Sequence, residues 1–264
     1  MKRRGFTLVE VMVVVVIIGM LAAIIFPVLA KSRGAAEKAS CVSNLRELSL
    51  ASSIYLQDYD DTMFLYGYNS GGRYLTWWGD LLTGKPDDGL LYPYTKSGRI
   101  RGCPAATTLP TSNPVTYTMG YGVNFRLFYS YPPANGPYGF TSTNGSHISE
   151  PSQTLFMADA AMWDQQNNRA IGTAWLMGDS WCYHLHARHV GDTANVAWID
   201  GHVTTEHLDY PSVRQGTPPF SVEATQLKAN RLGDLLKFAR EHPDSSVPSI
   251  RDQYYFLLDK APAL

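Results

Sequence analysis

The sequence contains little charge, little cysteine and almost no net charge of either sign. Charged residues make up 17% of the 264 residues, and 22 basic residues balance 23 acidic ones. This balance argues against a protein that wraps nucleic acid electrostatically, so we expect no nucleic-acid partner. Three cysteines exclude a disulfide-dense miniprotein. A hydrophobic content of 45% excludes disorder over most of the chain.

Common enzyme motifs are missing as well. The sequence has no nucleophile elbow, no phosphate-binding loop and no dinucleotide-binding fingerprint. It also lacks the helical zinc motif of metalloproteases. We therefore expect a protein that has no catalytic residues and is not an enzyme.

The apolar residues are concentrated in one long run close to the N-terminus. In residues 6–30, the residues outside the hydrophobic set are Thr7, Glu10, Gly19 and Pro27. Residues 11–30 carry no charge, and at about 1.5 Å per residue they span roughly 30 Å, the thickness of a bilayer core. Basic residues precede the run, which favours a cytoplasmic N-terminus and translocation of the rest of the chain. The sequence predicts one transmembrane helix.

A cleaved secretory signal is the alternative explanation of this run. Such a signal has a shorter apolar stretch and a small-residue cleavage site after it. Here the small residue Gly5 lies before the run, and the run contains a carboxylate, Glu10, near its start. A charge at the edge of an apolar span is costly and usually functional, so we favour a helix that is retained.

Residues 2–10, with the sequence KRRGFTLVE, resemble the leader and cleavage site of type IV prepilins and type II secretion pseudopilins. The resemblance implies that residues 1–5 are a leader, that a prepilin peptidase cuts between Gly5 and Phe6, and that the Phe6 amine is N-methylated. It implies a structural subunit of a type IV pilus-like or type II secretion pseudopilus filament. The implied partners are the peptidase, identical or related pilin subunits and inner-membrane lipid. The implied location is the bacterial inner membrane, crossed once, with the head in the periplasm or outside the cell.

Glu10 and Pro27 have expected roles in assembly. After cleavage, Phe6 and Glu10 are four residues apart and share one helix face. In an apolar filament core Glu10 would be an uncompensated charge unless a neighbouring subunit's Phe6 amine paired with it, and our hypothesis is that this pair sets the stagger between subunits. Pro27 leaves the carbonyl of Ala23 without its usual donor, which predicts a kink or local melting. Such a break would let a subunit stretch on assembly, although an incidental kink is an equal alternative.

The helix is expected to continue beyond the membrane run. Mostly apolar residues recur every three to four positions in residues 31–59, so a helix over residues 6–59 would be roughly 80 Å long. A compact domain does not need such a helix, but a lollipop does. We predict an α+β fold in which a long N-terminal transmembrane and filament helix packs on an antiparallel β-sheet head, residues 60–209. Residues 210–264 are predicted to form a helical C-terminal extension.

The clearest signal within the head is a β-hairpin. Two strand-like runs, residues 194–199 and 202–208, flank Asp200-Gly201, and glycine accepts the positive φ of a tight turn. Residues 154–158 predict a buried strand that ends at Asp159. Weaker signals predict a strand over residues 173–177, a short helix around 77–82, a surface loop over 131–137, and helices over 224–241 and from 249 to 258.

Head segments extend the resemblance to prepilin-type proteins with a C-terminal His-x9-Asp-Gly signature. The signature residues here are His189, Asp200 and Gly201, with ten residues between His189 and Asp200. We expect the extra residue in the turn at residues 191–193. The other head segments that carry this resemblance are Leu91 to Tyr94, Cys103-Pro104, Tyr121 to Asn124, Met157 to Ala160, and Arg188 beside His189. In the helix, Cys41 to Leu45 resembles the pseudopilin pattern.

His184, His186 and His189 form a dense histidine cluster. On a strand, His184 and His186 would share a face, because side chains repeat every two residues. A zinc site would also need a carboxylate, and the candidates are Asp159, Asp179 and Asp200. The interpretation that we favour is that the histidines border the hairpin, with His189 hydrogen-bonded to backbone or to a carboxylate. On that interpretation no cofactor is expected.

A calcium site is another possibility, because the resemblance implies one in a C-terminal loop of major pseudopilins. Calcium needs hard oxygen ligands. Acidic residues cluster in two places, but neither place has the spacing of a known calcium loop: Asp58, Asp60 and Asp61, and Asp87 with Asp88.

The predicted topology places the cysteines outside the cytoplasm, where disulfides persist. One bond and one free thiol fit three cysteines, and three pairings exist. We prefer Cys103 with Cys182, since both fall in the head and Cys41 falls in the helix. A metal role for Cys182, close to His184, stays open.

The alternative function is that of a minor pilin whose head acts as an adhesion module for a metal, a glycan or a cargo protein. A binding face could be built from tryptophans, among them Trp77, Trp78, Trp163, Trp175 and Trp181. Aromatic residues equally fill the core of a loop-rich head, which is the interpretation that we favour. Exposed tryptophans would support adhesion, whereas buried ones would support a structural subunit.

Overall fold

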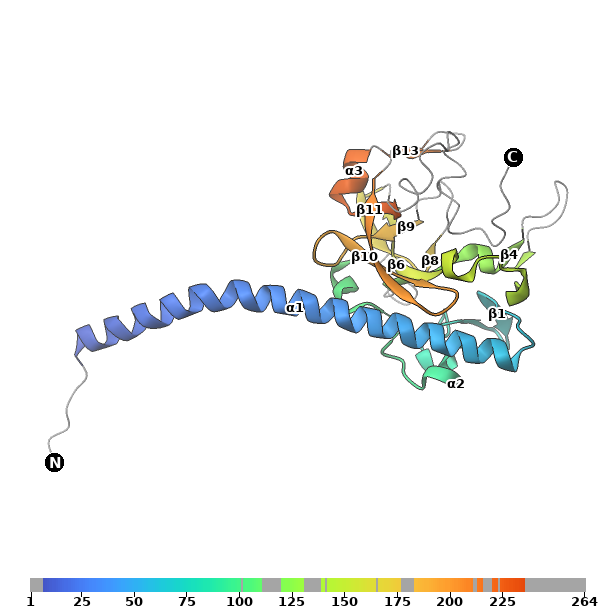
Figure 1. Cartoon of the computed structure of the whole chain (residues 1–264), viewed down its shortest axis with the longest axis horizontal. Helices are drawn as coiled ribbons and strands as arrows, with labels where there is room; N and C mark the ends of the chain where they lie inside the picture. The colour runs from blue at the N-terminus through green and yellow to red at the C-terminus, as the bar shows by residue number, and fades with distance from the viewer. Residues whose placement is uncertain are drawn as a thin grey trace, which may run out of the picture.

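One long helix projects from a β-rich head in the computed structural model (Figure 1). The structure describes residues 7–100, 102–110, 120–130, 139–140, 142–164, 166–176, 183–210, 213–215, 220–222 and 224–235. Helix α1 (Leu8–Asp58) contains 51 residues, close to the helix predicted over residues 6–59. Together with the sheet that follows, it gives the predicted α+β, pilin-like architecture.

Helix α1 begins with a capping box. Thr7 is the N-cap: its hydroxyl accepts the Glu10 N–H at 3.3 Å, and Glu10 Oε2 accepts the Thr7 N–H at 2.8 Å. Beyond its last turn, Asp60 and Asp61 adopt positive φ angles of 50° and 58°, which turns the chain back toward the head. The prediction at Pro27 was a kink or local melting. Helix α1 continues through Pro27 without a break and curves gently (Figure 1), so the single chain shows no melting there, and a role of Pro27 in assembly stays a prediction.

The two halves of α1 have different surroundings. Every residue from 8 to 20 is exposed, and so is nearly every residue from there to 30, whereas the buried residues of α1 all fall in its second half: Cys41, Leu45, Leu48, Ser49, Ala51 and Ser52. Their spacing of three to four residues places them on one face, which packs against the head. Figure 1 shows the first half extending beyond the head.

The main sheet is mixed but mostly antiparallel, and its order is β10-β11-β14-β9-β6-β3-β8, with β7 paired to β6. Its strands are β3 (Tyr121–Asn124), β6 (Leu155–Asp164), β7 (Arg169–Gly172), β8 (Trp175–Leu176), β9 (Tyr183–His186), β10 (Thr193–Trp198), β11 (Val203–Asp209) and β14 (Leu232–Leu235). The pair β3–β8 is parallel, which departs from the purely antiparallel head predicted. An extra pairing of β10 with β6 closes a ring of five strands, β6-β9-β14-β11-β10.

Smaller elements surround this sheet. Three two-stranded ribbons pair β1 (Gly67–Ser70) with β2 (Arg73–Thr76), β4 (Tyr129–Ser130) with β5 (Gly139–Phe140), and β12 (Val213–Gln215) with β13 (Phe220–Val222). The short helices are α2 (Tyr92–Thr95), α3 (Ala224–Ala229), η1 (Pro86–Asp88), η2 (Pro104–Thr108), η3 (Phe125–Leu127), η4 (Gly145–His147) and η5 (Pro151–Gln153). Helix α1 packs against β10, β11, α2 and η2, which hold its second half on the head.

Strand β6 is the centre of the sheet and is longer than the sequence predicted. The predicted strand was to end at Asp159, but β6 continues to Asp164 because it finds new partners there. Residues 155–158 pair with β10, and residues 160–162 pair with β9. The neighbouring strand therefore changes at Asp159, and the sheet forks at this residue.

The predicted hairpin is confirmed. Strands β10 and β11 pair in antiparallel register, with Ala197 opposite Val203. The turn is closed by the Gly201 N–H, which donates to the Trp198 carbonyl at 3.0 Å, and Gly201 has a φ of 92°. A residue with a side chain would be strained at that angle. The turn therefore needs glycine, which is the reason that Asp200-Gly201 predicted it.

Two weaker predictions in the head are corrected. Residues 77–82 form bends and turns rather than a helix, because Asp80 accepts the Leu82 N–H and pairs with Arg73, which fixes a loop. The strand predicted over residues 173–177 is found in shortened form as β8, Trp175–Leu176; Thr173 and Ala174 lie before it, and Met177 lies outside the described residues. The loop predicted over residues 131–137 lies outside the described residues.

The predicted helix over residues 224–241 is also corrected. Helix α3 ends at Ala229, Arg231 takes a positive φ of 56°, and β14 then enters the sheet between β11 and β9. A Cβ at Gly233 would lie 2.3 Å from the Asp209 carbonyl oxygen, so the close approach of β14 to β11 requires glycine. The helix predicted from residue 249 to 258 lies outside the described residues.

The aromatic residues support the prediction of a core. Trp77, Trp78 and Trp163 are buried, and Trp77 and Trp78 lie in the main core cluster beneath α1. Trp175 is partly buried and stacks on Tyr66. Trp181 lies outside the described residues.

Candidate functional site

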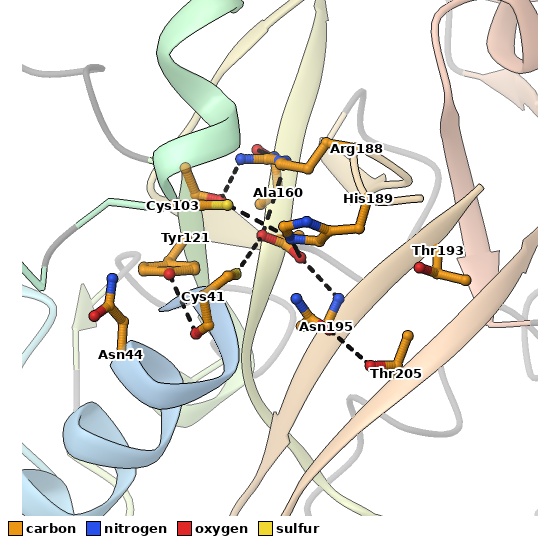
Figure 2. Close-up of polar contacts among 12 residues, drawn as sticks. Cys41, Asn44, Cys103, Tyr121, Ala160, Arg188, His189, Thr193, Asn195 and Thr205 are labelled. Atoms are coloured by element: carbon orange, nitrogen blue, oxygen red, sulfur yellow. Dashed lines mark hydrogen bonds and ion pairs between the residues drawn. The ribbon is translucent and has the colours of Figure 1, made fainter. Parts of the chain in front are cut away.

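Two features of the structure carry chemistry: the capped start of α1, and a cluster of four ligand-type side chains buried where α1 meets the sheet. The cluster (the buried cluster below) consists of Cys41, Cys103, Asp159 and His189, and one ligand atom from each lies within 4.8 Å of the others. Figure 2 shows Cys41, Cys103 and His189 pointing toward a common centre.

The buried cluster is assembled from four distant segments of the chain. Cys41 lies on the buried face of α1, and Cys103 is the residue before η2. Asp159 lies at the fork of β6. His189 follows β9, and its backbone N–H donates to the Thr193 carbonyl at 3.1 Å across a tight turn. The fold therefore brings these four side chains together only when the helix is docked on the completed sheet.

The distances within the buried cluster are short. His189 Nε2 lies 3.0 Å from Asp159 Oδ2 and 3.5 Å from Cys103 Sγ. Cys41 Sγ lies 3.3 Å from Asp159 Oδ1. All four side chains are shielded from solvent, since Cys41 and Asp159 are 0% exposed and Cys103 and His189 are each 3% exposed.

Asp159 is held as a carboxylate in spite of its burial. Burial alone would raise the pKa of Asp159, but the charge of Arg188 and the hydrogen bond from His189 keep that pKa below its usual value. The backbone N–H of Asn195 donates to Asp159 Oδ2 at 2.7 Å. The pairing of β10 with β6 ends just before this point, at Val196 and Ala158. The Asp159 carboxylate therefore gives the Asn195 N–H an acceptor where β6 no longer pairs with β10.

Arg188 is fixed beside this carboxylate. Its guanidinium donates to the Gly120 carbonyl at 2.9 Å and to the Ala160 carbonyl at 2.6 Å, and its Nε lies 3.8 Å from Asp159 Oδ1 (Figure 2). The Arg188 side chain is 3% exposed. A buried positive charge thus stands at one side of the buried cluster.

The other members of the buried cluster have shifted pKa values. Burial opposes protonation of His189, but Asp159 and then Cys103 raise the pKa of His189 to about 9. Hydrogen bonding from Cys41 lowers the pKa of Cys103 to about 6 in spite of burial, with a further contribution from His189. Burial raises the pKa of Cys41.

The arrangement is unlike a catalytic relay. In a nucleophile–histidine–carboxylate triad, the carboxylate and the nucleophile bond to opposite ring nitrogens. Here Asp159 and Cys103 both approach the same nitrogen of His189, Nε2. Both thiols are also buried, so a substrate has no access to them. Convergence on a single ring nitrogen is instead the geometry of ligands around a common point.

The predicted histidine site is only partly reproduced. His189 bonds to a carboxylate, as the favoured interpretation expected, and that carboxylate is Asp159. His186 is buried elsewhere, beside a groove that Leu109, Asn230 and Arg231 also line. Burial, with the charge of Arg188, lowers the pKa of His186 to about 3. The side chain of His184 and all of Asp179 lie outside the described residues.

The signature residues do not meet one another. Asp200 lies in the turn between β10 and β11, where its carboxylate accepts the His202 N–H at 3.1 Å, and Gly201 closes that turn. His189 lies instead in the buried cluster. The signature therefore marks two structural positions, a turn and a buried polar centre, rather than a single site.

The preferred disulfide is corrected. Cys103 is a free thiol and lies beside Cys41, which is also free. The prediction failed because it treated the helix and the head as separate units, whereas Cys41 lies on the helix face that packs on the head. Cys182 lies outside the described residues.

Sequence reasoning missed Cys41 and Cys103 as partners of His189 and Asp159. A signal was available: the segments that carry the family resemblance contribute every member of the buried cluster, together with Arg188 beside it and Tyr121, whose hydroxyl donates to the Cys41 carbonyl at 3.3 Å. Taken together, these segments point to one buried centre.

At the other end of α1, the structure describes Glu10 but not the cleavage site. Glu10 Oε2 accepts hydrogen bonds from the Thr7 N–H and from the Thr7 hydroxyl, the latter at 2.7 Å. Among the described residues, no basic side chain pairs with Glu10. Gly5 and Phe6 lie outside the described residues.

The acidic clusters have local partners. The Tyr94 hydroxyl donates to Asp58 Oδ2 at 2.9 Å, and Asp88 pairs with Arg73. Asp61 accepts the Gly145 N–H through its backbone carbonyl at 2.7 Å. These contacts link α1, η1 and η4 to the rest of the head. No observation tests whether either acidic cluster binds calcium, so the calcium site stays a prediction.

The fold and the capped apolar helix define a protein of pilin-like architecture, in which one helix serves both as a free apolar rod and as part of the head. The N-terminal segment is of the prepilin type: the family model for the prokaryotic N-terminal methylation motif matches residues 1–26. That model includes Gly5, Phe6 and Glu10, and it does not reach the signature residues His189 and Asp200.

Curated relatives support the same class. The chain is similar to the type II secretion system core protein G of Escherichia coli (strain K12), with 46% identity over 57 residues, which are 22% of this chain and 39% of the relative. It is 40% identical to the protein of that name from Pectobacterium carotovorum subsp. carotovorum over 57 residues, 22% of this chain and 36% of the relative. The matches thus span less than half of these relatives. No solved structure matches the chain.

Proposed function

We propose that this protein is a structural subunit of a type II secretion pseudopilus or a type IV pilus-like filament. The observation that carries the proposal is the first half of α1, whose apolar side chains are exposed on every face and have no partner within the described residues. A surface of this kind must be covered by lipid or by other apolar helices. The prepilin motif and the similarity to core protein G support the filament.

Anchoring and processing follow from the same segment. Helix α1 is long and apolar enough, by length and composition, to cross a membrane. We propose that it holds the subunit in the inner membrane, crossed once, with the head translocated. The proposed processing is cleavage by a prepilin peptidase between Gly5 and Phe6, followed by methylation of the Phe6 amine. The matched motif supports this step because it covers both residues.

Glu10 is the proposed assembly residue. Among the described residues its carboxylate is bonded only by Thr7, through two hydrogen bonds to one oxygen, Oε2. In an apolar filament core this carboxylate needs a positive partner, and the Phe6 amine of a neighbouring subunit would supply one. Heterologous contacts that repeat without closing would then build a helical filament from pilin subunits.

Adhesion and catalysis are less well supported. The buried state of Trp77 and Trp78 removes the aromatic binding face that the adhesion alternative needs among the described residues. The groove that His186 lines includes neither Asp159 nor Asp200, so these residues do not form the histidine–carboxylate cleft that an enzyme would need. We therefore propose a non-catalytic subunit.

The proposal is tested by producing the chain together with a prepilin peptidase and the pilus assembly proteins of its host. Mass spectrometry of the mature N-terminus should find Phe6 first and carrying one methyl group. Glu10→Ala should be cleaved normally but should form no filaments in electron micrographs. Glu37→Ala, which removes a partly exposed carboxylate of the same helix that pairs with Arg33, is the matched control and should assemble.

Three results would contradict the proposal: an intact leader, cleavage after Ala30, or normal filaments from Glu10→Ala. The first two would remove the prepilin class. The third would leave that class intact and remove the role of Glu10 in setting the stagger.

A further inference from the structure

We propose that Cys41, Cys103, Asp159 and His189 bind one transition-metal ion in tetrahedral geometry, with Zn²⁺ as the best match. The site goes beyond the proposed filament function, and it lies away from the exposed part of α1. It rests on the position of four side chains that the fold brings together and shields from solvent.

The spacing of the ligand atoms fits a small tetrahedral ion. With Zn–S bonds of about 2.3 Å and Zn–N and Zn–O bonds of about 2.0–2.2 Å, the ligand atoms of a tetrahedron lie roughly 3.3–3.8 Å apart. Three contacts that join the ligand atoms of the buried cluster measure 3.5 Å from Cys103 to His189, 3.3 Å from Cys41 to Asp159, and 3.0 Å from His189 to Asp159. Small side-chain movements would make room for the ion.

The direction of His189 supports the same point. Its Nε2 atom faces both Cys103 Sγ and Asp159 Oδ2. A neutral imidazole can offer one lone pair at this nitrogen, and both partner atoms lie within 3.5 Å of it. An ion at this position would be bound by His189 at the point where the Cys103 and Asp159 ligand atoms converge.

The donor set selects the class of metal. Two thiolates and an imidazole are soft or borderline donors, which suit zinc and related first-row ions. Calcium and magnesium prefer oxygen ligands in larger numbers, and Asp159 is the only oxygen donor in the buried cluster. Four protein ligands leave no open position, so the site would be structural rather than catalytic.

The buried charges also balance around such an ion. Two thiolates, one carboxylate and a neutral imidazole around Zn²⁺ carry a net charge of about −1, and Arg188 supplies the compensating positive charge next to Asp159. Arg188 is held in place by the carbonyls of Gly120 and Ala160, and Asp159 by the Asn195 N–H. Such surrounding hydrogen bonds orient metal ligands in known sites. Binding would release to solvent the thiol protons and any proton on His189 Nε2.

The consequence of binding would be a crosslink between the helix and the head. The four ligands come from α1, from the segment before η2, from β6 and from the turn between β9 and β10. An ion held by all four would oppose any separation of α1 from the sheet. Metal binding would therefore act as folding free energy for the docked state.

The test uses the full-length chain, purified in detergent and under reducing conditions without chelator. Elemental analysis should find about one zinc per chain, falling below about 0.2 in Cys103→Ser and in His189→Ala. His202→Ala removes an exposed histidine in the turn between β10 and β11, and it is the matched control that should keep its zinc. Replacement of zinc by Co²⁺ should give the intense visible bands of a tetrahedral ion and a thiolate charge-transfer band.

Measurements on the unmodified chain keep the proposal testable if a variant fails to fold. Chelation of zinc should lower the Tm of the head by several degrees, and added Zn²⁺ alone should restore it. Three results would overturn the proposal: reduced, folded protein that takes up no zinc or cobalt; zinc that persists in both Cys103→Ser and His189→Ala; or a Cys41–Cys103 disulfide, found by peptide mapping of oxidised protein, that forms equally in the presence of Zn²⁺. None of these results depends on whether filaments form.

Discussion

The two halves of α1 are one continuous helix, yet they follow opposite rules of composition. Between residues 8 and 30 apolar side chains point in every direction and are exposed. From Cys41 to Ser52 the buried residues, most of them apolar, return every three to four positions on the face that packs against the head. The first half is built for a partner that lies outside the chain, whereas the second half has its partner within it.

This difference separates stability from assembly. The head and the docked half of α1 form one folded unit, so changes there should appear in unfolding experiments on a single chain. Changes in the exposed half should leave the unfolding of the head unaltered and should act only when lipid or another subunit covers that half. Matched substitutions in the two halves therefore test whether the boundary is real.

The largest effect is expected from Leu45→Ala. Leu45 is 0% exposed in the core beneath the sheet, so its truncation should destabilise the head by about 2–5 kcal/mol. Leu21→Ala, in the exposed half, should change the free energy of unfolding of the head by less than about 0.5 kcal/mol. Both are measured by denaturant unfolding of the purified chain in detergent.

Equal losses in these two variants would show that the exposed half also stabilises the head. No loss in Leu45→Ala would show instead that the second half of α1 is not docked in solution. Either outcome would remove the boundary between the two halves.

A smaller effect is expected at Gly34, where α1 first approaches the head. A Cβ at this position would lie 2.8 Å from Cγ2 of Val190, but Val190 is exposed and its side chain can move aside. The helix-propensity gain of Gly34→Ala should then dominate and stabilise the docked helix by about 0.5 kcal/mol. The measurement is the same unfolding experiment, with Gly34→Ala/Val190→Ala as the control that removes the contact. A loss above about 1 kcal/mol that the control restores would place a rigid contact at this boundary.

The smallest effect is a pH dependence that comes from one carboxylate of the head. Hydrogen bonds from the Leu82 N–H and the Thr83 hydroxyl, with Arg73 nearby, hold the pKa of Asp80 below its ordinary value of 3.8. A carboxylate with a lowered pKa contributes stability above 3.8, and this contribution is lost as the pH falls through the lower, folded-state pKa. Residues 11–30 of the exposed half carry no titratable group, so this part of α1 should not respond to acid.

Asp80→Asn tests this expectation. Between about pH 5 and about pH 2, the free energy of unfolding should fall less steeply for this variant than for the unmodified chain. Asp87→Asn, an exposed acidic residue of η1, is the matched control and should follow the unmodified chain. Identical slopes for all three proteins would contradict the proposed role of Asp80.

What could be predicted from the sequence was decided by local patterns. The uninterrupted apolar run specifies α1, and the Asp200-Gly201 pair between two strand-like runs specifies the hairpin of β10 and β11, because each needs only nearby residues. The prepilin motif is likewise contained in residues 1–26. These features were predicted close to their observed bounds.

What could not be predicted depends on contacts between distant residues. Strand β6 continues past Asp159 because β9 and β7 pair with it there, and the predicted helix after α3 becomes β14 because β11 and β9 offer it a place. The buried cluster joins residues up to 148 positions apart, Cys41 and His189, which no periodicity records. Residues 224–241 have helical spacing, but residues 232–235 form a strand because two neighbouring strands pair with them.

The place of β14 in the ring has a consequence for the order of events during folding. Leu232–Leu235 are the last strand residues of the described chain, and they fill the gap between β9 and β11, which come earlier. Until they arrive, β9 and β11 each present an unpaired edge, the kind of surface that recruits strands from other chains. While these edges are open the head is prone to aggregation, and this stage ends only when residues 232–235 pair with both strands. Holding each chain in the membrane by α1 during this interval would keep the open edges apart.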